Sequence, residues 1–256
     1  MKIASFPGVA ALHVWLMAAA AASPLQDAVR SHRVAHEQEL MAEYRELVAI
    51  PNVGSDQPNT RRNADFIVAM MQRRGIPAEL LEGRTSATNP LVFGEIKVPG
   101  ATRTVVFYAH YDGMPVNPKE WAEGLDPWKP VFLSAPLARG GKIVTDWKPG
   151  DTINPDWRVN GRASADDKAG IFSILNGYAA LVATAGRPTV NVKFVFEGEE
   201  EMGSTHLGEL IELHRAKLAS DLWIICDGPR PVSGRKAVVF GVRGDVNMHL
   251  TAYGAK

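Results

Sequence analysis

The chain has 256 residues and a formal net charge of zero at pH 7, with 28 basic and 28 acidic side chains. This balance argues against a nucleic-acid-binding protein that works through bulk positive charge, because phosphate contacts require a basic excess. Hydrophobic residues make up 46% of the chain, which is enough for a folded core. The single cysteine, Cys226, excludes an internal disulfide and a zinc site of paired cysteines, so any metal must be bound by oxygen and imidazole.

The first 22 residues have the pattern of a secretory signal peptide. Lys2 supplies a positive charge, residues 6–22 are almost wholly apolar, and the run ends in the small residues of a cleavage site. An uncleaved membrane anchor is the alternative, but the run is short for a bilayer span and contains His13. We therefore predict cleavage near Ala22, export to the periplasm or the medium, and no stable membrane association afterwards.

Two helices are predicted before the first strand. Residues 25–50 form the first, which Pro51 ends. Its apolar stripe consists of Leu40, Met41, Tyr44, Leu47 and Val48. The second begins at Asn59 or Thr60 and ends before Gly75. Its inner face consists of Ala64, Ile67, Val68 and Met71.

Strands and helices alternate in the rest of the chain. The predicted strands are 91–98, 104–109, 190–196, 221–226, 236–242 and 245–253. The predicted helices are 168–185 and a segment that Ser204 or Thr205 caps, and a long loop covers residues 111–161. This alternation predicts an α/β fold with a largely parallel, mixed sheet and helices on both faces.

Polar residues follow the predicted strands, where sites form in open α/β sheets. His110 and Asp112 come directly after the strand 104–109 and lie two residues apart, so both point to the same side of an extended chain. An imidazole there can bind a metal while the carboxylate holds its other ring nitrogen. Taken alone, the pair also fits a loop histidine that bonds to its neighbour.

Carboxylates mark the other strand ends. Asp166 and Asp167 open a helix that a single aspartate would be enough to cap. Residues 197–201 (EGEEE) adjoin no basic cluster, so a divalent metal is the simplest counter-charge. Asp227 follows another strand, although aspartate before Gly-Pro is also common in turns. Together these residues predict a site for two metal ions, zinc or else manganese or cobalt.

The order of these motifs resembles one known family. The motifs are H-x-D at 110–112, G-R-x-x-x-D-D-K-x-G at 161–170, E-E-x-G-S at 200–204 and an aspartate, Asp227, after a strand. This order and its spacings are similar to those of the co-catalytic di-zinc metallopeptidases of clan MH. That group includes carnosinase, glutamate carboxypeptidase, aminoacylase and succinyl-diaminopimelate desuccinylase. The resemblance extends over nearly all of the chain after residue 22.

The resemblance implies a role for each matching residue. The metal ligands would be His110, Asp166 as the bridge between two zinc ions, Glu201 and Asp227. Asp112 would orient His110, Glu200 would be the general base, and the peptide bond between Asp166 and Asp167 would be cis. The implied activity is hydrolysis of a peptide or amide bond by a water held between the zinc ions. Dipeptidases, carboxypeptidases and N-acyl amino acid deacylases act in this way, on small peptides or N-acyl amino acids.

The family's last metal ligand is a histidine far downstream, beyond an inserted lid or dimerisation domain. His206, His214 and His249 are interpreted as structural or surface residues instead. The resemblance thus implies that residues 23–242 are the N-terminal part of a catalytic domain, and that 243–256 begin a lid through which the family forms homodimers. These 256 residues alone are expected to be inactive. Two alternatives stay open: a non-catalytic exported metal-binding relative, and a di-zinc aminopeptidase, which the lysine after the aspartate pair disfavours.

Overall fold

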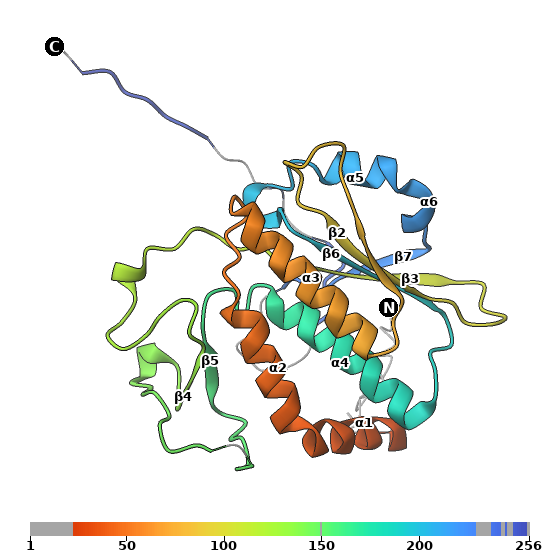
Figure 1. Ribbon diagram of the computed structural model, residues 1–256, viewed down its shortest axis with the longest axis horizontal. Coiled ribbons are helices and arrows are strands. Elements are labelled where there is room, and N and C mark those ends of the chain that lie inside the picture. The colour runs from red at the N-terminus through yellow and green to blue at the C-terminus, as the bar shows by residue number, and fades with distance from the viewer. Residues whose placement is uncertain (1–22, 149, 229–236, 242–243, 245–247, 255–256) are drawn as a thin grey trace, which may run out of the picture.

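The computed structural model describes residues 23–148, 150–228, 237–241, 244 and 248–254 (Figure 1). Its centre is a five-stranded sheet with the strand order β1-β2-β6-β3-β7. The strands are β1 (Ala78–Leu81), β2 (Leu91–Ile96), β3 (Thr104–His110), β6 (Asn191–Glu197) and β7 (Leu222–Ile225). β3 pairs in parallel with β6 and β7, whereas β2 pairs antiparallel with β1 and β6. Four of the five strands therefore run in one direction, which confirms the largely parallel, mixed sheet.

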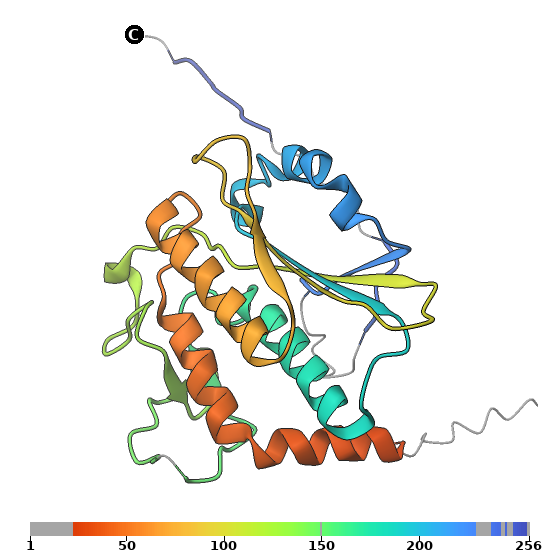
Figure 2. The same ribbon diagram turned by 45° about the vertical axis from the view of Figure 1, so that its right-hand side comes forward.

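Helices cover both faces of this sheet (Figures 1 and 2). One face carries α1 (Pro24–Ala35), α2 (Glu37–Ala49), α3 (Gln57–Arg73) and α4 (Lys168–Ala185), and the other carries α5 (Leu207–Leu213) and α6 (Arg215–Leu218). Alternate side chains of β6 pack against the two layers of helices, because successive side chains of a strand point to opposite faces. Phe194 and Phe196 pack in the cluster under α2–α4, and Val195 packs with Leu210 and Leu218 in the cluster under α5 and α6.

The predicted strands 91–98, 104–109, 190–196 and 221–226 correspond to β2, β3, β6 and β7, and the predicted helix 168–185 is α4. The short edge strand β1 was not predicted from the sequence. Inside the predicted long loop, β4 (Val131–Leu133) pairs with β5 (Arg158–Asn160), and 3₁₀ turns lie at Pro118–Glu120 and Leu137–Arg139. Among the described residues, no helix is both long and apolar enough to cross a membrane.

The prediction of one helix over residues 25–50 is wrong. The chain forms two helices, α1 and α2, which meet at an angle at His36 (Figure 2). His36 departs from helical geometry, with φ −111° and ψ 10°, and its N–H donates to the carbonyls of His32 and Arg33. The apolar stripe lies on α2 alone, where Tyr44 and Leu47 are buried. The break lets α1 lie along α4 while α2 packs on the core.

Two other helix starts differ from the prediction. α3 begins at Gln57 rather than at Asn59 or Thr60, because Asp56 accepts the N–H of Asn59 and caps the helix. The helix expected to start from Ser204 or Thr205 has His206 as its N-terminal cap instead. That segment breaks again at His214, which separates α5 from α6.

The strands predicted at 236–242 and 245–253 are not formed by the described residues of that segment, 237–241, 244 and 248–253. A strand needs a hydrogen-bonded neighbour, and none of the described strands pairs with them. Phe240 and Leu250 are both 98% exposed. The other positions of these two strands, like the predicted signal peptide 1–22, lie outside the described residues.

An ion network joins α2, α3 and α4, three of the four helices that cover one face of the sheet. The carboxylate of Glu43 on α2 accepts hydrogen bonds from both terminal nitrogens of Arg74, and Arg73 donates to it at 2.8 Å. Arg74, at the end of α3, also donates to Oδ1 of Asn176 on α4 at 2.7 and 3.2 Å. Burial raises the pKa of Glu43, but the hydrogen bonds and charges of Arg74 and Arg73 outweigh burial and hold that pKa below its usual value.

We predict that Glu43→Gln lowers the free energy of unfolding at neutral pH by about 1–3 kcal/mol, because it removes charge-assisted hydrogen bonds from a largely buried carboxylate. The folded-state pKa is depressed, so this stabilisation is complete above the unfolded pKa of about 4.3 and is lost as the pH falls through the folded value. Urea unfolding at neutral and acidic pH measures the difference. Glu46→Gln, an exposed position on the same helix, is the control, and equal losses in both variants would contradict the prediction.

Candidate metal centre

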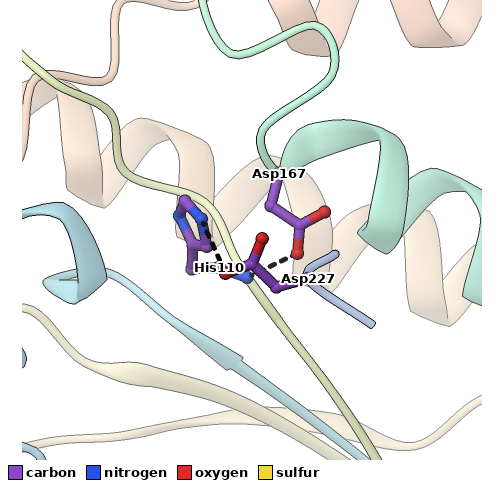
Figure 3. A group of neighbouring side chains, drawn as sticks. All are labelled: His110, Asp167 and Asp227. Carbon is purple, nitrogen blue, oxygen red and sulfur yellow. Dashed lines mark hydrogen bonds and ion pairs between the residues drawn. The ribbon is translucent and has the colours of Figure 1, made fainter. Parts of the chain in front are cut away.

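The candidate site lies at the edge of the sheet where the three parallel strands end. His110 is the last residue of β3 and lies opposite Glu197, the last residue of β6. Asp227 follows β7 by two residues, and the start of α4 with Asp167 reaches the same edge (Figure 3). Parallel strands bring their carboxyl ends together, so motifs far apart in the sequence meet here.

Carboxylates surround the Nε2 atom of His110, whose side chain is fully buried. Oδ1 of Asp166 lies 2.9 Å from this atom, Oδ2 of Asp227 3.7 Å and Oε2 of Glu200 3.8 Å. Oδ1 of Asp112, also fully buried, lies 3.3 Å from Nδ1, the other ring nitrogen. The structure therefore brings four of the other five residues singled out in the sequence around the imidazole ring of His110.

Asp112 also holds the turn that carries the sixth residue, Glu201. Its Oδ1 accepts the N–H of Glu200 and its Oδ2 accepts the N–H of Glu201, both at 3.1 Å. The residue expected to orient His110 therefore orients the backbone of both glutamates as well. Sequence reasoning missed this link because Asp112 and Glu200 are 88 residues apart and neither motif reveals it. The Glu201 carboxylate makes no ion pair with His110.

The two adjacent aspartates have different surroundings. Asp167 is 3% exposed and caps α4, with Oδ1 accepting the N–H of Gly170 at 3.1 Å and Oδ2 accepting the N–H of His110 at 3.3 Å. The Asp166 side chain is 68% exposed and turns toward the His110 ring. The peptide bond between them is cis, as the resemblance implies. The compact group in Figure 3, His110 with Asp167 and Asp227, thus includes an aspartate to which the sequence analysis gave no metal role.

The site is strongly negative. Burial and the charge of Asp227 raise the pKa of Asp167 to about 7 against the opposing effect of His110, and burial also raises the pKa of Glu200, Glu201 and Asp227. Burial by itself would lower the pKa of His110, but the adjacent Asp112 and the charges of Asp167 and Asp227 raise it to about 10. These pKa values rise because acidic groups crowd together in a desolvated site. Each carboxyl group there resists ionisation, and the protonated form of His110 is favoured.

No lysine or arginine among the described residues forms an ion pair with these acids. Lys168, the next residue in the chain, points away and donates at 2.8 Å to the carbonyls of Leu47 and Ile50. A divalent cation would supply the missing positive charge, and a donor set of carboxylates and one imidazole without a thiolate fits zinc, manganese or cobalt.

The sequence matches peptidase family M20/M25/M40 over residues 106–254, a range that holds every predicted site residue. The chain belongs to this family. It is 27% identical to human Beta-Ala-His dipeptidase over 226 residues, which are 82% of this chain and 40% of that protein. It is 25% identical to the Cys-Gly metallodipeptidase dug1 of Schizosaccharomyces pombe over 232 residues, 85% of this chain and 44% of that protein. The chain therefore spans less than half the length of these relatives.

Solved structures agree with this family membership. The M20 family metallo-carboxypeptidase Sso-CP2 from Sulfolobus solfataricus matches with a TM-score of 0.60 and 26% identity, over 77% of this chain and 39% of that one. Human carnosine dipeptidase 1 shares the fold, with a TM-score of 0.62 and 24% identity over 81% of this chain and 42% of that one. The resemblance inferred from the order of the motifs is confirmed.

We predict that zinc stabilises the protein against heat and that Asp227→Asn reduces this effect. A ligand that binds only the folded state stabilises it by about 2.7 kcal/mol at a concentration 100-fold above its Kd. Removing one carboxylate charge beside His110 weakens binding and so shrinks the zinc-dependent shift in Tm. Asp146→Asn, in an exposed loop position between β4 and β5, is the control. An undiminished shift in Asp227→Asn would place the metal elsewhere.

Proposed function

We propose that the protein is a metal-dependent hydrolase that cleaves the peptide bond of a dipeptide or another small peptide. The observation that carries this proposal is the convergence of Asp166, Glu200 and Asp227 on the buried imidazole of His110, in a chain of a peptidase family. The names of the relatives, a Beta-Ala-His dipeptidase and a Cys-Gly metallodipeptidase, support a small peptide as substrate. C-terminal residues of longer peptides and N-acyl amino acids are the other substrate classes to compare.

We assign the binding of two zinc ions to His110, Asp166, Glu201 and Asp227, with Asp166 shared between them. Zinc, when bound, supplies a Lewis acid for the substrate carbonyl and makes water at the site more acidic. Asp112 keeps the His110 ring and the glutamate turn in place through the contacts described above. Manganese or cobalt would suit the same oxygen and imidazole donors.

We assign the role of general base to Glu200. Its side chain is 39% exposed, so it is open to water at the edge of the cluster. Burial and the charges of Asp227, Asp112 and Asp166 raise its pKa, against the opposing effect of His110. A carboxylate with a raised pKa accepts a proton more readily than an ordinary one and can return it to the leaving amine.

Export and assembly are further parts of the proposal. Residues 1–22 have the composition of a cleaved signal peptide, which supports a periplasmic or secreted enzyme. Homodimers through a lid domain stay a prediction from the resemblance. A non-catalytic metal-binding relative and a di-zinc aminopeptidase are the competing functions.

We predict that Glu200→Gln lowers kcat by about 10²–10⁴-fold while the protein keeps its metal, because the amide cannot accept the proton. Glu201→Gln is the matched comparison and should lose metal affinity. The protein is purified from its own cells, its intact mass is recorded, and zinc content and amino-acid release are measured. The substrates are dipeptides, N-acetylated amino acids and peptides with blocked termini.

Each outcome separates the candidate functions. Release of amino acids from free dipeptides that stops in Glu200→Gln supports the proposal. Tight zinc binding without turnover of any substrate supports the non-catalytic relative. Cleavage that needs a free amino terminus but tolerates a blocked carboxyl terminus supports the aminopeptidase. Unchanged turnover in Glu200→Gln would exclude Glu200 as the base.

A further inference from the structure

Glu199 is a buried carboxylate next to the site that the roles above leave unused. It is 2% exposed and directly precedes Glu200 and Glu201. Its Oε1 accepts the N–H of Asn89 at 2.9 Å, and its Oε2 accepts the N–H of His206 at 3.1 Å. The ring Nδ1 of His206 lies 2.8 Å from Oε2 and 3.0 Å from Oε1. The carboxylate is therefore paired by the protein itself rather than left for a metal.

These contacts close the turn that carries the two glutamates. The backbone carbonyl of Glu199 accepts the N–H of Met202 at 3.1 Å and of Ser204 at 2.8 Å. Its side chain holds His206, the cap of α5. Residues 200–205 are thus tied at both ends to a single residue, Glu199.

Asn89, whose N–H donates to Glu199, is itself held in place by hydrogen bonds. Asn89 is buried, and its Nδ2 donates to the carbonyls of Gly54 and Gly198 at 2.9 and 2.8 Å. Its Oδ1 accepts the hydroxyl of Thr60 on α3 at 2.8 Å. The fold therefore fixes the position of the backbone N–H that donates to Glu199.

The turn also lies close to Gly54. A Cβ atom added to Gly54 would lie 2.9 Å from Cγ of Met202 and 3.0 Å from Oδ2 of Asp112. A larger residue at position 54 would have to displace Asp112 or the Met202 side chain, which is itself 41% exposed. The turn is therefore held mainly by its hydrogen bonds.

We propose that Glu199 and His206 form a clamp that positions Glu200 and Glu201. Asp112 holds the N–H groups of the two glutamates from one side, and the clamp closes their turn from the other. Two repelling carboxylates need such support to keep one geometry before a metal arrives. The effect on kcat rests on the proposed function, whereas the effect on zinc affinity requires only that Glu201 is a ligand.

The test compares three variants of the clamp. Glu199→Gln keeps the size of the side chain but places an amide group against backbone N–H donors, so one of them loses its acceptor. It should lower zinc affinity and kcat by about 10–100-fold, as changes to residues that support metal ligands do, with KM little changed. His206→Ala removes the ring and should lower both by about 10-fold, at the weak end of that range. His206→Asn places an amide donor near the position of Nδ1 and should restore both to within about threefold of wild type.

A matched control is His214→Ala, which removes a half-buried ring that contacts the carbonyl of Glu82 at 2.9 Å on the same side of the sheet. It should leave zinc affinity and kcat unchanged. Affinity is measured by competition with a chromogenic chelator, kcat and KM by dipeptide hydrolysis, and folding by circular dichroism and Tm.

Several results would overturn the clamp. The first is wild-type zinc affinity and kcat in folded Glu199→Gln and His206→Ala, including the case in which only Tm falls. The second is a failure of His206→Asn to recover what His206→Ala loses. If Glu199→Gln does not fold, the histidine pair decides alone. If the wild type hydrolyses nothing, the proposed function fails while zinc affinity still tests the clamp.

Discussion

Repulsion between carboxylates is the constraint on which the site depends. Asp166, Glu200 and Asp227 all come within 4 Å of one ring nitrogen of His110. Two like charges 4 Å apart repel by about 4 kcal/mol at an effective dielectric constant of 20. A flexible chain would relieve this by moving the side chains apart, so the scaffold must hold them. The benefit is a preorganised negative site that favours a divalent cation.

The acidic residues in and around the site differ in burial and in hydrogen bonding. Asp112, Asp167 and Glu199 are buried, and each accepts hydrogen bonds from two backbone N–H groups. These hydrogen bonds satisfy charges that burial would otherwise penalise. Asp166 and Glu200, by contrast, keep exposed carboxylates that the backbone does not occupy. The buried acids therefore stabilise the fold around the site, and the exposed acids are the ones available for the metal and substrate chemistry proposed above.

The sequence predicts those parts of the fold and site that depend on local patterns. β3 and β6 are apolar runs that end in polar motifs, and α4 begins at an aspartate pair and ends at Gly186, so both boundaries could be placed. The break at His36 was out of reach of the sequence, because no proline or glycine marks it and the contact of α1 with α4 exists only in the fold. The hydrogen bonds of Asp112 and the role of Asn89 were equally out of reach, since each joins segments that only the folded sheet brings together.

Asp166 illustrates how a helix that supplies no ligand can still position the site. The hydroxyl of Tyr44 on α2 donates to the carbonyl of Ser164, two residues before Asp166. On the other side, the buried Lys168 ammonium donates to the carbonyls of Leu47 and Ile50, at the end of the same helix. Burial holds the pKa of Lys168 well below its usual range. α2 thereby fixes the loop before and after the aspartate pair, and the exposed Asp166 side chain is aimed at His110 by a backbone held on both sides.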